Sequence, residues 1–299
     1  MILSTLLLTL CVSAHSQDAI FRTSVALVRA DAQVIESGNI VRNLTKEDFI
    51  LRDNGEPREI LYFGQEEDPL DVILVLDASG SMDRAIQQAR DAAREALRAL
   101  RPGDRVAVTR FTRHPSTAIP FTEDRARVEQ AIAEICNRPF GGGTDILGAL
   151  QHASDQFLDL ARTRRRRAIL IITDGQSQSY LPQQAVLRKL WEADAVLNAL
   201  QVKGPRFLNG GMNLRMRLTG VDLKHLAAET GGEVVKATRI GDDFHRILER
   251  MRLRYSIHFA PRQTTPGQQR AVTIELSETA RRQHPSARVH ARKAYISPQ

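Results

Sequence analysis

The segment from Val72 to Met82 constrains the fold of this chain more than any other. The apolar run Val72-Ile73-Leu74-Val75-Leu76 is followed at once by Asp77-Ala78-Ser79-Gly80-Ser81-Met82. An uninterrupted apolar run of this length is typical of a strand that is buried on both faces of a parallel sheet. The polar residues that follow therefore leave the carboxyl end of a strand, which is where open α/β sheets bind their ligands.

The loop after this strand offers oxygen donors that suit a hard cation. Asp77 supplies a carboxylate, Ser79 and Ser81 supply hydroxyls at alternate positions, and Gly80 permits a tight turn. Oxygen ligands of this kind are typical of a site for a divalent cation such as Mg²⁺. The alternative is structural: Asp77 could be a turn former, and the two serines could cap a helix that starts near Asp83.

The pattern Asp-x-Ser-x-Ser after a buried strand resembles the metal-ion-dependent adhesion site of von Willebrand factor type A domains. The resemblance implies a threonine in a second loop and an aspartate after a later strand. Gly141-Gly142-Gly143-Thr144-Asp145 is a glycine-rich loop that opens a helical pattern, and the apolar run 168–173 ends in Asp174-Gly175. Thr230-Gly231-Gly232 is a further feature that such domains often show, and the resemblance covers about residues 70–250.

Five residues are thus candidate metal ligands, for Mg²⁺ or Mn²⁺. Ser79 and Ser81 would donate hydroxyl oxygens directly, and Thr144 would add a third, directly or through water. Asp77 and Asp174 would hold metal-bound waters by hydrogen bonds. Neutral ligands leave the cation poorly neutralised, so the natural sixth ligand is an Asp or Glu carboxylate of a partner protein. Taken singly, Thr144 could instead be a helix N-cap, and Asp174 could belong to an ordinary turn.

Strand and helix patterns alternate through the middle of the chain. This alternation predicts an α/β fold with a doubly wound, mostly parallel, Rossmann-like sheet and helices on both faces. We expect strands over 105–111, 168–173 and 196–202, and helices near 84–100, 124–136, 145–161, 182–193, 221–229 and 242–253. Lys203–Gly220 has no clear periodicity and is expected to be a long loop, either a partner contact or a simple connection.

Both flanks of this core have strand patterns. The expected strands are Phe21–Arg29, Ala32–Glu36, Phe49–Arg52, Glu59–Phe63, Tyr255–Phe259, Val272–Leu276 and Ala287–Tyr295, with a hairpin turn at Asp53-Asn54-Gly55. Neither flank is long enough for a comfortable core alone, so we expect the two to form one small β-sandwich. The expected domains are a signal peptide over 1–16, an N-terminal β segment over 17–67, the type A domain over 68–251, and a C-terminal β segment over 252–299 that pairs with 17–67.

The N-terminus carries a candidate signal peptide. The run Ile2–Val12 is apolar and is followed by small residues, yet it is too short to span a bilayer. Leu10 disfavours lipidation of Cys11, because a lipobox needs a smaller residue there. We therefore expect a secreted, periplasmic or cell-envelope protein that does not cross the membrane. Without the signal Cys136 is alone, so it is expected to be a small buried hydrophobe rather than half of a disulfide.

The chain is basic, with 42 Lys and Arg against 35 Asp and Glu and a formal net charge of +7. The basic residues are scattered apart from the run 162–167, which we expect to lie at the surface as a solvated edge beside a helix C-terminus. Aromatic residues make up 5%, so the stacking platforms that nucleic-acid binding uses are scarce. The composition therefore favours an acidic partner or an anionic envelope surface over nucleic acid.

Three classes of function are compatible with these patterns. The favoured one is a non-enzymatic protein-binding or adhesion module that recognises a partner carboxylate through a bound divalent cation. The alternative is a structural envelope component in which the metal only stabilises the fold. A hydrolase with Asp77 or Ser79 as its nucleophile is disfavoured, because the chain has neither an Asp-x-Asp motif there nor a Gly-x-Ser-x-Gly elbow. The sequence carries no signal for the oligomeric state.

Overall fold

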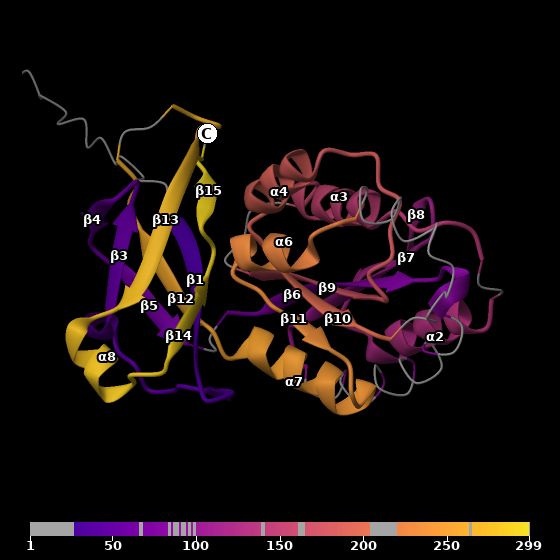
Figure 1. Ribbon diagram of the computed structural model, residues 1–299, viewed down its shortest axis with the longest axis horizontal. Coiled ribbons are helices and arrows are strands. Elements are labelled where there is room, and N and C mark those ends of the chain that lie inside the picture. The colour runs from indigo at the N-terminus through magenta and orange to yellow at the C-terminus, as the bar shows by residue number, and fades with distance from the viewer. Residues whose placement is uncertain are drawn as a thin grey trace, which may run out of the picture.

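Figure 1 shows the computed structural model, in which an α/β unit and a smaller all-β unit lie side by side. The structure describes residues 27–65, 68–82, 100–138, 141–160, 165–203, 220–262 and 265–298, together with positions 85, 90, 94 and 97. The expected signal peptide, most of the helix expected near 84–100 and nearly all of the loop Lys203–Gly220 lie outside these residues. The expected fold class is confirmed, because a mostly parallel sheet lies between helices and antiparallel sheets flank it.

The central sheet has the strand order β11-β10-β9-β6-β7-β8. Its strands are β6 (Leu70–Asp77), β7 (Arg105–Phe111), β8 (Pro115–Thr122), β9 (Arg166–Thr173), β10 (Ala195–Gln201) and β11 (Val234–Lys236). All neighbours pair in parallel except β8, which runs antiparallel to β7 at one edge. Every residue of β6 is buried, as the uninterrupted apolar run predicts for a strand covered on both faces.

Helices cover both faces of this sheet (Figure 1). α2 (Arg125–Cys136) and α7 (Ile240–Arg252) lie on one face, and α3 (Ile146–Leu158), α4 (Gln183–Glu192) and α6 (Leu223–Thr230) lie on the other. Alternate residues of β6 enter the two cores: Leu74 packs on the first face, and Ile73 and Val75 pack on the second. Cys136 is buried and unbridged in the first core, as expected.

The two flanks together form the all-β unit. One sheet contains β1 (Val28–Glu36), β2 (Asn39–Ile40), β5 (Tyr62–Gln65), β12 (Tyr255–Phe259) and β14 (Arg288–Ala291). The other contains β3 (Phe49–Asp53), β4 (Glu56–Arg58), β13 (Gln269–Leu276) and β15 (Ala294–Ile296). Strands from the two ends of the chain alternate, since β12 pairs with both β1 and β5 and β13 pairs with β3. Both sheets contribute to one hydrophobic core, which gives the expected β-sandwich. The domain boundaries given above stay a prediction.

Three expectations about the flanks were wrong or incomplete. The strands expected at Phe21–Arg29 and Ala32–Glu36 are one strand from Val28 within the described residues, because Ala30 and Ala32 are both buried in the sandwich. The strand expected over Ala287–Tyr295 is two strands in different sheets, and the chain crosses between them at Arg292-Lys293. The short helices η1 (Lys46–Asp48) and α8 (Glu278–Gln283) were not anticipated.

The edge strand β8 was also not predicted from the sequence. Half of its residues are exposed, and it is rich in Ser, Thr and Pro, so it shows no apolar alternation. Proline and short polar residues are typical of edge strands, where one row of backbone groups faces solvent. Within the described ranges, every helix falls short of the length and apolarity needed to cross a lipid bilayer.

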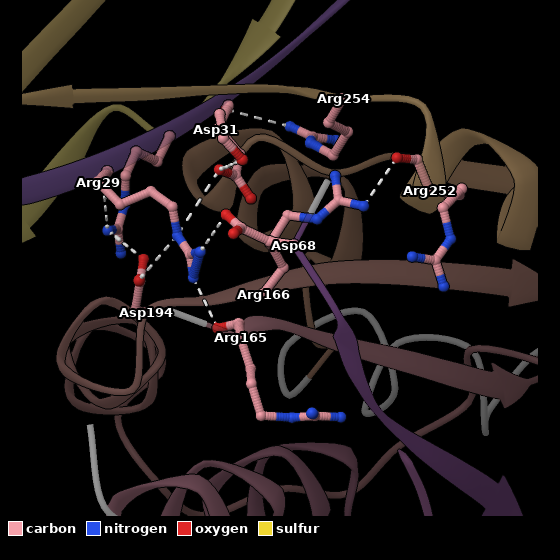
Figure 2. Close-up of polar contacts among 10 residues, drawn as sticks. Arg29, Asp31, Asp68, Arg165, Arg166, Asp194, Arg252 and Arg254 are labelled. Carbon is pink, nitrogen blue, oxygen red and sulfur yellow. Dashed lines mark hydrogen bonds and ion pairs between the residues drawn. The ribbon is translucent and has the colours of Figure 1, made fainter. Parts of the chain in front are cut away.

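A buried cluster of charges joins the two units (Figure 2). Arg29 on β1 lies 3.7 Å from Asp31, 3.3 Å from Asp68 and 3.7 Å from Asp194, which follows α4. Its guanidinium also donates to the Arg165 carbonyl at 2.6 Å. This single arginine therefore ties the sandwich to the amino-terminal side of the central sheet, where β6 and β9 begin.

The arginine run 162–167 is not a solvated edge, so this expectation was wrong for its described part. Arg166 and Arg167 are only 2% and 8% exposed. Arg166 donates to the Arg252 carbonyl at 2.7 Å (Figure 2), and Arg167 donates to the Ala193 carbonyl at 3.1 Å. The run becomes buried because the sandwich covers this end of the sheet, and backbone carbonyls at the junction accept its hydrogen bonds.

The junction favours ionised side chains of both signs. Burial alone would raise the pKa of Asp31, but attraction from Arg29, Arg166, Arg254 and Arg292 outweighs it, and the pKa lies below its ordinary value. Burial alone would likewise lower the pKa of Arg29, but attraction from Asp31, Asp194 and Asp68 outweighs it and raises that pKa. Arg254 is the exception, because burial lowers its pKa to about 10. Buried ion pairs add little net stability, because desolvation offsets attraction, but an unpaired charge there would be costly. The cluster therefore favours one relative position of the two units.

Candidate functional site

The candidate site lies at the opposite, carboxyl edge of the central sheet. β6 has β7 on one side and β9 on the other, so the strand order reverses there. Such a switch point leaves a crevice outside the carboxyl ends of the strands, because the connections on its two sides diverge. Asp77 ends β6, Thr112 follows β7, and Asp174 follows β9. The fold thus brings three loops that are distant in sequence to one place.

Asp77 is fully buried and its carboxylate is fixed at both oxygens. Oδ1 accepts a hydrogen bond from the Ser79 backbone N–H at 3.0 Å, and Oδ2 accepts one from the Thr173 hydroxyl at 2.6 Å. Burial raises the pKa of Asp77 above its ordinary value, those hydrogen bonds oppose the rise, and the nearby Asp174 carboxylate adds to it. A cation at this edge would relieve the desolvated negative charge, so the electrostatics of the site suit a metal ion.

The two serines have a spacing that suits neighbouring metal ligands. The Ser79 and Ser81 hydroxyl oxygens are 3.2 Å apart. Adjacent oxygens around Mg²⁺ are about 3 Å apart, since each lies about 2.1 Å from the metal at right angles to the other. The turn that presents them is η2 (Gly80–Met82), and the buried Met82 side chain anchors it in the core.

The loop that carries Thr144 is held by backbone hydrogen bonds from three sides. The Gly141 N–H donates to the Ala78 carbonyl at 3.3 Å, and the Asp145 N–H donates to the Thr112 carbonyl at 2.9 Å. The Thr144 carbonyl accepts from the Gln178 N–H at 2.9 Å. These bonds fix Thr144 beside the loop of Ser79 and beside the loop that follows β9.

Thr144 is not the N-cap of α3, so that alternative was wrong. The cap is Asp145, whose Oδ1 accepts from the Gly148 N–H at 2.9 Å. The turn-forming roles considered for Asp77 and Asp174 are confirmed, because each carboxylate accepts a backbone N–H within its own turn. Asp174 accepts from the Gln176 backbone at 3.0 Å and from its side-chain amide at 3.2 Å. A carboxylate held in this way keeps lone pairs that can accept hydrogen bonds from metal-bound water.

Sequence reasoning missed two further residues of the site, Ser177 and Ser179. The Ser177 hydroxyl accepts from the Ile146 N–H at 3.0 Å, and the Ser179 hydroxyl accepts from the Leu147 N–H at 3.1 Å. With Asp145, they satisfy the first three N–H groups of α3, although they lie about thirty residues further along the chain. The repeated Ser-x-Ser after Asp174 was a signal, but only the fold reveals its target. These bonds lock the Asp174 loop onto the Thr144 loop.

Replacing Ser177 with Ala should therefore weaken both the fold and the site. The buried Ile146 N–H would lose its partner, which costs about 1–3 kcal/mol of unfolding free energy. The measurement is chemical unfolding, with Ser116→Ala, an exposed serine on β8, as the matched control. A Ser177→Ala protein as stable as the Ser116→Ala control would contradict this reading of the loop.

The five sequence-proposed residues thus gather at one edge, with Asp77 and Ser79 buried and Ser81 and Thr144 partly exposed. In the described part of the chain, no three His, Cys, Asp or Glu side chains form a metal cluster. Two carboxylates and three hydroxyls are a donor set for a cation that keeps several waters, as Mg²⁺ does. The Ser79 hydroxyl is within hydrogen-bond distance of the Ser81 hydroxyl.

A hollow lies at the junction of the two units, away from this edge of the sheet. It has a volume of about 420 Å³, and Trp191, Tyr295 and His258 contribute to its lining. Arg29, Asp68 and Asp194 also line it, but these charges pair with one another. Among the described residues, the lining of the hollow includes no serine or threonine, whereas the carboxyl edge of the sheet brings three such hydroxyl side chains together.

Comparisons with known proteins agree with the α/β architecture. Residues 72–176, about a third of the chain, match the family model of the von Willebrand factor type A domain, and this region has the fold of that domain. No curated protein matches the chain.

Several solved structures resemble it. An aerotolerance-related membrane protein from Bacteroides fragilis NCTC 9343, with multiple mutations to serines, is 17% identical over 61% of this chain and 98% of its own, with a TM-score of 0.48. The conserved hypothetical protein BatB from Bacteroides thetaiotaomicron is 19% identical over 61% and 97%, with a TM-score of 0.45. A von Willebrand factor type A protein from Catenulispora acidiphila is 12% identical over 85% and 74%, with a TM-score of 0.49.

Proposed function

We propose that this protein is a non-enzymatic binding module that recognises an acidic side chain of a partner protein through a bound divalent cation. The observation that carries the proposal is the convergence of two carboxylates and three hydroxyls at the switch point of the central sheet. Ser79, Ser81 and Thr144 would supply ligand oxygens to Mg²⁺ or Mn²⁺. Asp77 and Asp174 would accept hydrogen bonds from the waters that the metal retains.

The distribution of charge supports an anionic partner. The ligands nearest to solvent, Ser81 and Thr144, are neutral, whereas Asp77 is buried beneath them. The cation would therefore keep most of its positive charge on the side that a partner approaches, and a carboxylate is the hard, anionic ligand that it prefers. The basic balance of the whole chain would further attract an acidic partner.

The second candidate function is a structural envelope component whose metal only stabilises the fold. The hydrogen bonds that join the Asp77, Thr144 and Asp174 loops favour it to some extent, since a metal would strengthen the same connections. Both candidates include secretion or residence in the periplasm or cell envelope, which follows from the candidate signal peptide.

A retention experiment distinguishes the two candidates. Immobilised protein is exposed to envelope extract in Mg²⁺ and in EDTA, beside a Thr144→Ala variant and the Ser116→Ala control, and retained proteins are identified by mass spectrometry. A partner retained in Mg²⁺ by the wild type and the control, but lost in EDTA and with Thr144→Ala, would support recognition. A melting temperature that rises with Mg²⁺ while all samples retain the same proteins would overturn recognition in favour of the structural role.

A further inference from the structure

We propose that Arg113 determines specificity at this site by binding a second acidic group of the partner, next to the one that binds the metal. The preferred partner segment would then carry two acidic side chains close together in sequence. This inference rests on the proposed function, since the first acidic group is assigned to the cation. It adds the requirement for a second acidic side chain in the partner, which a metal site alone does not impose.

The position of Arg113 carries the inference. Arg113 follows β7, and the preceding Thr112 carbonyl accepts the Asp145 N–H at 2.9 Å, so the two loops run side by side. A Cβ atom at Gly143 would lie 3.5 Å from both Nε and one terminal nitrogen of Arg113. The guanidinium therefore lies against the backbone of Gly143, the residue directly before the proposed ligand Thr144.

The charge of Arg113 is available to a partner. The side chain is exposed, and among the described residues none forms an ion pair or hydrogen bond with it. The nearest acidic side chain in the adjoining loop, Asp145, accepts instead from the Gly148 N–H and from the Ser179 hydroxyl. In contrast, the buried Arg29 at the junction is paired with three aspartates. The fold thus pairs the buried Arg29 with carboxylates, whereas Arg113, beside the candidate site, has no such partner among the described residues.

The chemistry of arginine suits a carboxylate. Its planar guanidinium presents N–H donors as a fork that matches the two oxygens of Asp or Glu, and lysine lacks this geometry. A Cβ atom at Gly143 would be in ordinary van der Waals contact with the planar group, so the guanidinium lies close to this backbone. A segment with one carboxylate on the cation would therefore gain a second, directional contact from a neighbouring carboxylate.

The test uses a random peptide library displayed on phage, selected on the purified protein in Mg²⁺. The wild type, Arg113→Gln, Arg113→Lys and the matched control Arg262→Gln are compared, since Arg262 is an exposed arginine in the sandwich. The wild type and Arg262→Gln should enrich peptides with two neighbouring acidic residues, whereas Arg113→Gln should enrich peptides with one. Arg113→Lys should retain a weaker preference for peptides with two acidic residues, because the positive charge remains but the forked N–H donors of the guanidinium are lost.

Affinities of selected peptides then give a double-mutant cycle. Replacing one acidic residue of the pair with its amide should weaken binding to the wild type by up to about fivefold, the range of a solvent-exposed ion pair. The same change should leave binding to Arg113→Gln unaltered. Equal enrichment of acidic pairs by Arg113→Gln and the wild type would overturn the role of Arg113 and leave the proposed function standing. Enrichment that persists in EDTA would overturn both.

Discussion

Replacing Asp77 with Asn is expected to reduce Mg²⁺ affinity about 10- to 100-fold while leaving the metal-free protein no less stable than the wild type. Asp77 is completely buried, and burial raises its pKa, so the ionised side chain is held at an energetic cost. Asn has nearly the same shape and can still accept from the Ser79 N–H, while the Thr173 hydroxyl can turn to accept from its amide. The substitution removes the charge that the cation requires and keeps the turn.

The dependence on pH follows from the direction of the pKa shift. Because the folded-state pKa of Asp77 is raised, the folded metal-free protein binds the proton more tightly than the unfolded chain. Its stability should therefore fall as pH rises from the ordinary pKa of Asp through the raised one, and stay lower above it. Mg²⁺ competes with that proton, so affinity for the metal should rise over the same interval. Asp77→Asn should remove the contribution of this residue to both trends.

Isothermal titration calorimetry with MgCl₂ and thermal unfolding in Mg²⁺ and in EDTA provide the measurement. Asp159→Asn is the matched control, because Asp159 is an exposed aspartate beyond the end of α3. The control should bind Mg²⁺ like the wild type and show the same rise in melting temperature. An Asp77→Asn protein that still gains stability from Mg²⁺ would place the metal elsewhere in the molecule.

Replacing Gly232 with Ala is expected to cost more than about 4 kcal/mol of unfolding free energy, the range of the most damaging single substitutions. A Cβ atom at this position would lie 1.8 Å from the Leu197 carbonyl oxygen and 2.7 Å from its carbon. Both atoms belong to the backbone of β10 inside the central sheet, so no side-chain rotation can relieve the overlap. The sheet would have to deform or separate from the end of α6.

Urea unfolding of Gly232→Ala and of a second glycine variant, Gly267→Ala, measures this effect. Gly267 has φ +78° but no atom within 4 Å of its would-be Cβ, so its substitution should cost only about 1 kcal/mol of backbone strain. If Gly232→Ala yields no soluble protein while Gly267→Ala does, the result agrees with a larger loss of unfolding free energy at Gly232 than at Gly267. Equal stability of the two variants would mean that β10 accommodates the added methyl group.

The structure explains why glycine occupies the last two positions of Thr230-Gly231-Gly232. The sequence identified it as a feature of type A domains and gave no reason for the glycines. Gly231 ends α6 in a left-handed conformation at φ +83°, and a Cβ there would lie 2.6 Å from the backbone of Ala291 and Arg292. One glycine is thus required where the helix meets the sandwich, and the next where it meets the central sheet.

Sequence patterns alone determined the doubly wound fold. The apolar run of β6 specified a strand covered on both faces, and helical spacing specified the covering helices. These two inferences succeeded because they depend on periodicity and order along the chain. Thr144 and Asp174 entered the candidate site through the resemblance to type A domains, and the metal-binding role of the five residues stays a prediction.

The tertiary structure decided everything that depends on contacts between distant residues. Arg166 looked like part of a solvated charge run until the sandwich covered it, and Ser177 gained a role only when α3 came within reach of its hydroxyl. Arg113 has the local sequence of an ordinary loop, and its place beside Gly143 follows from the pairing of two loops. Burial and hydrogen-bond partners are set by the packing of whole elements, so the local sequence around a charged or hydroxyl side chain does not specify them.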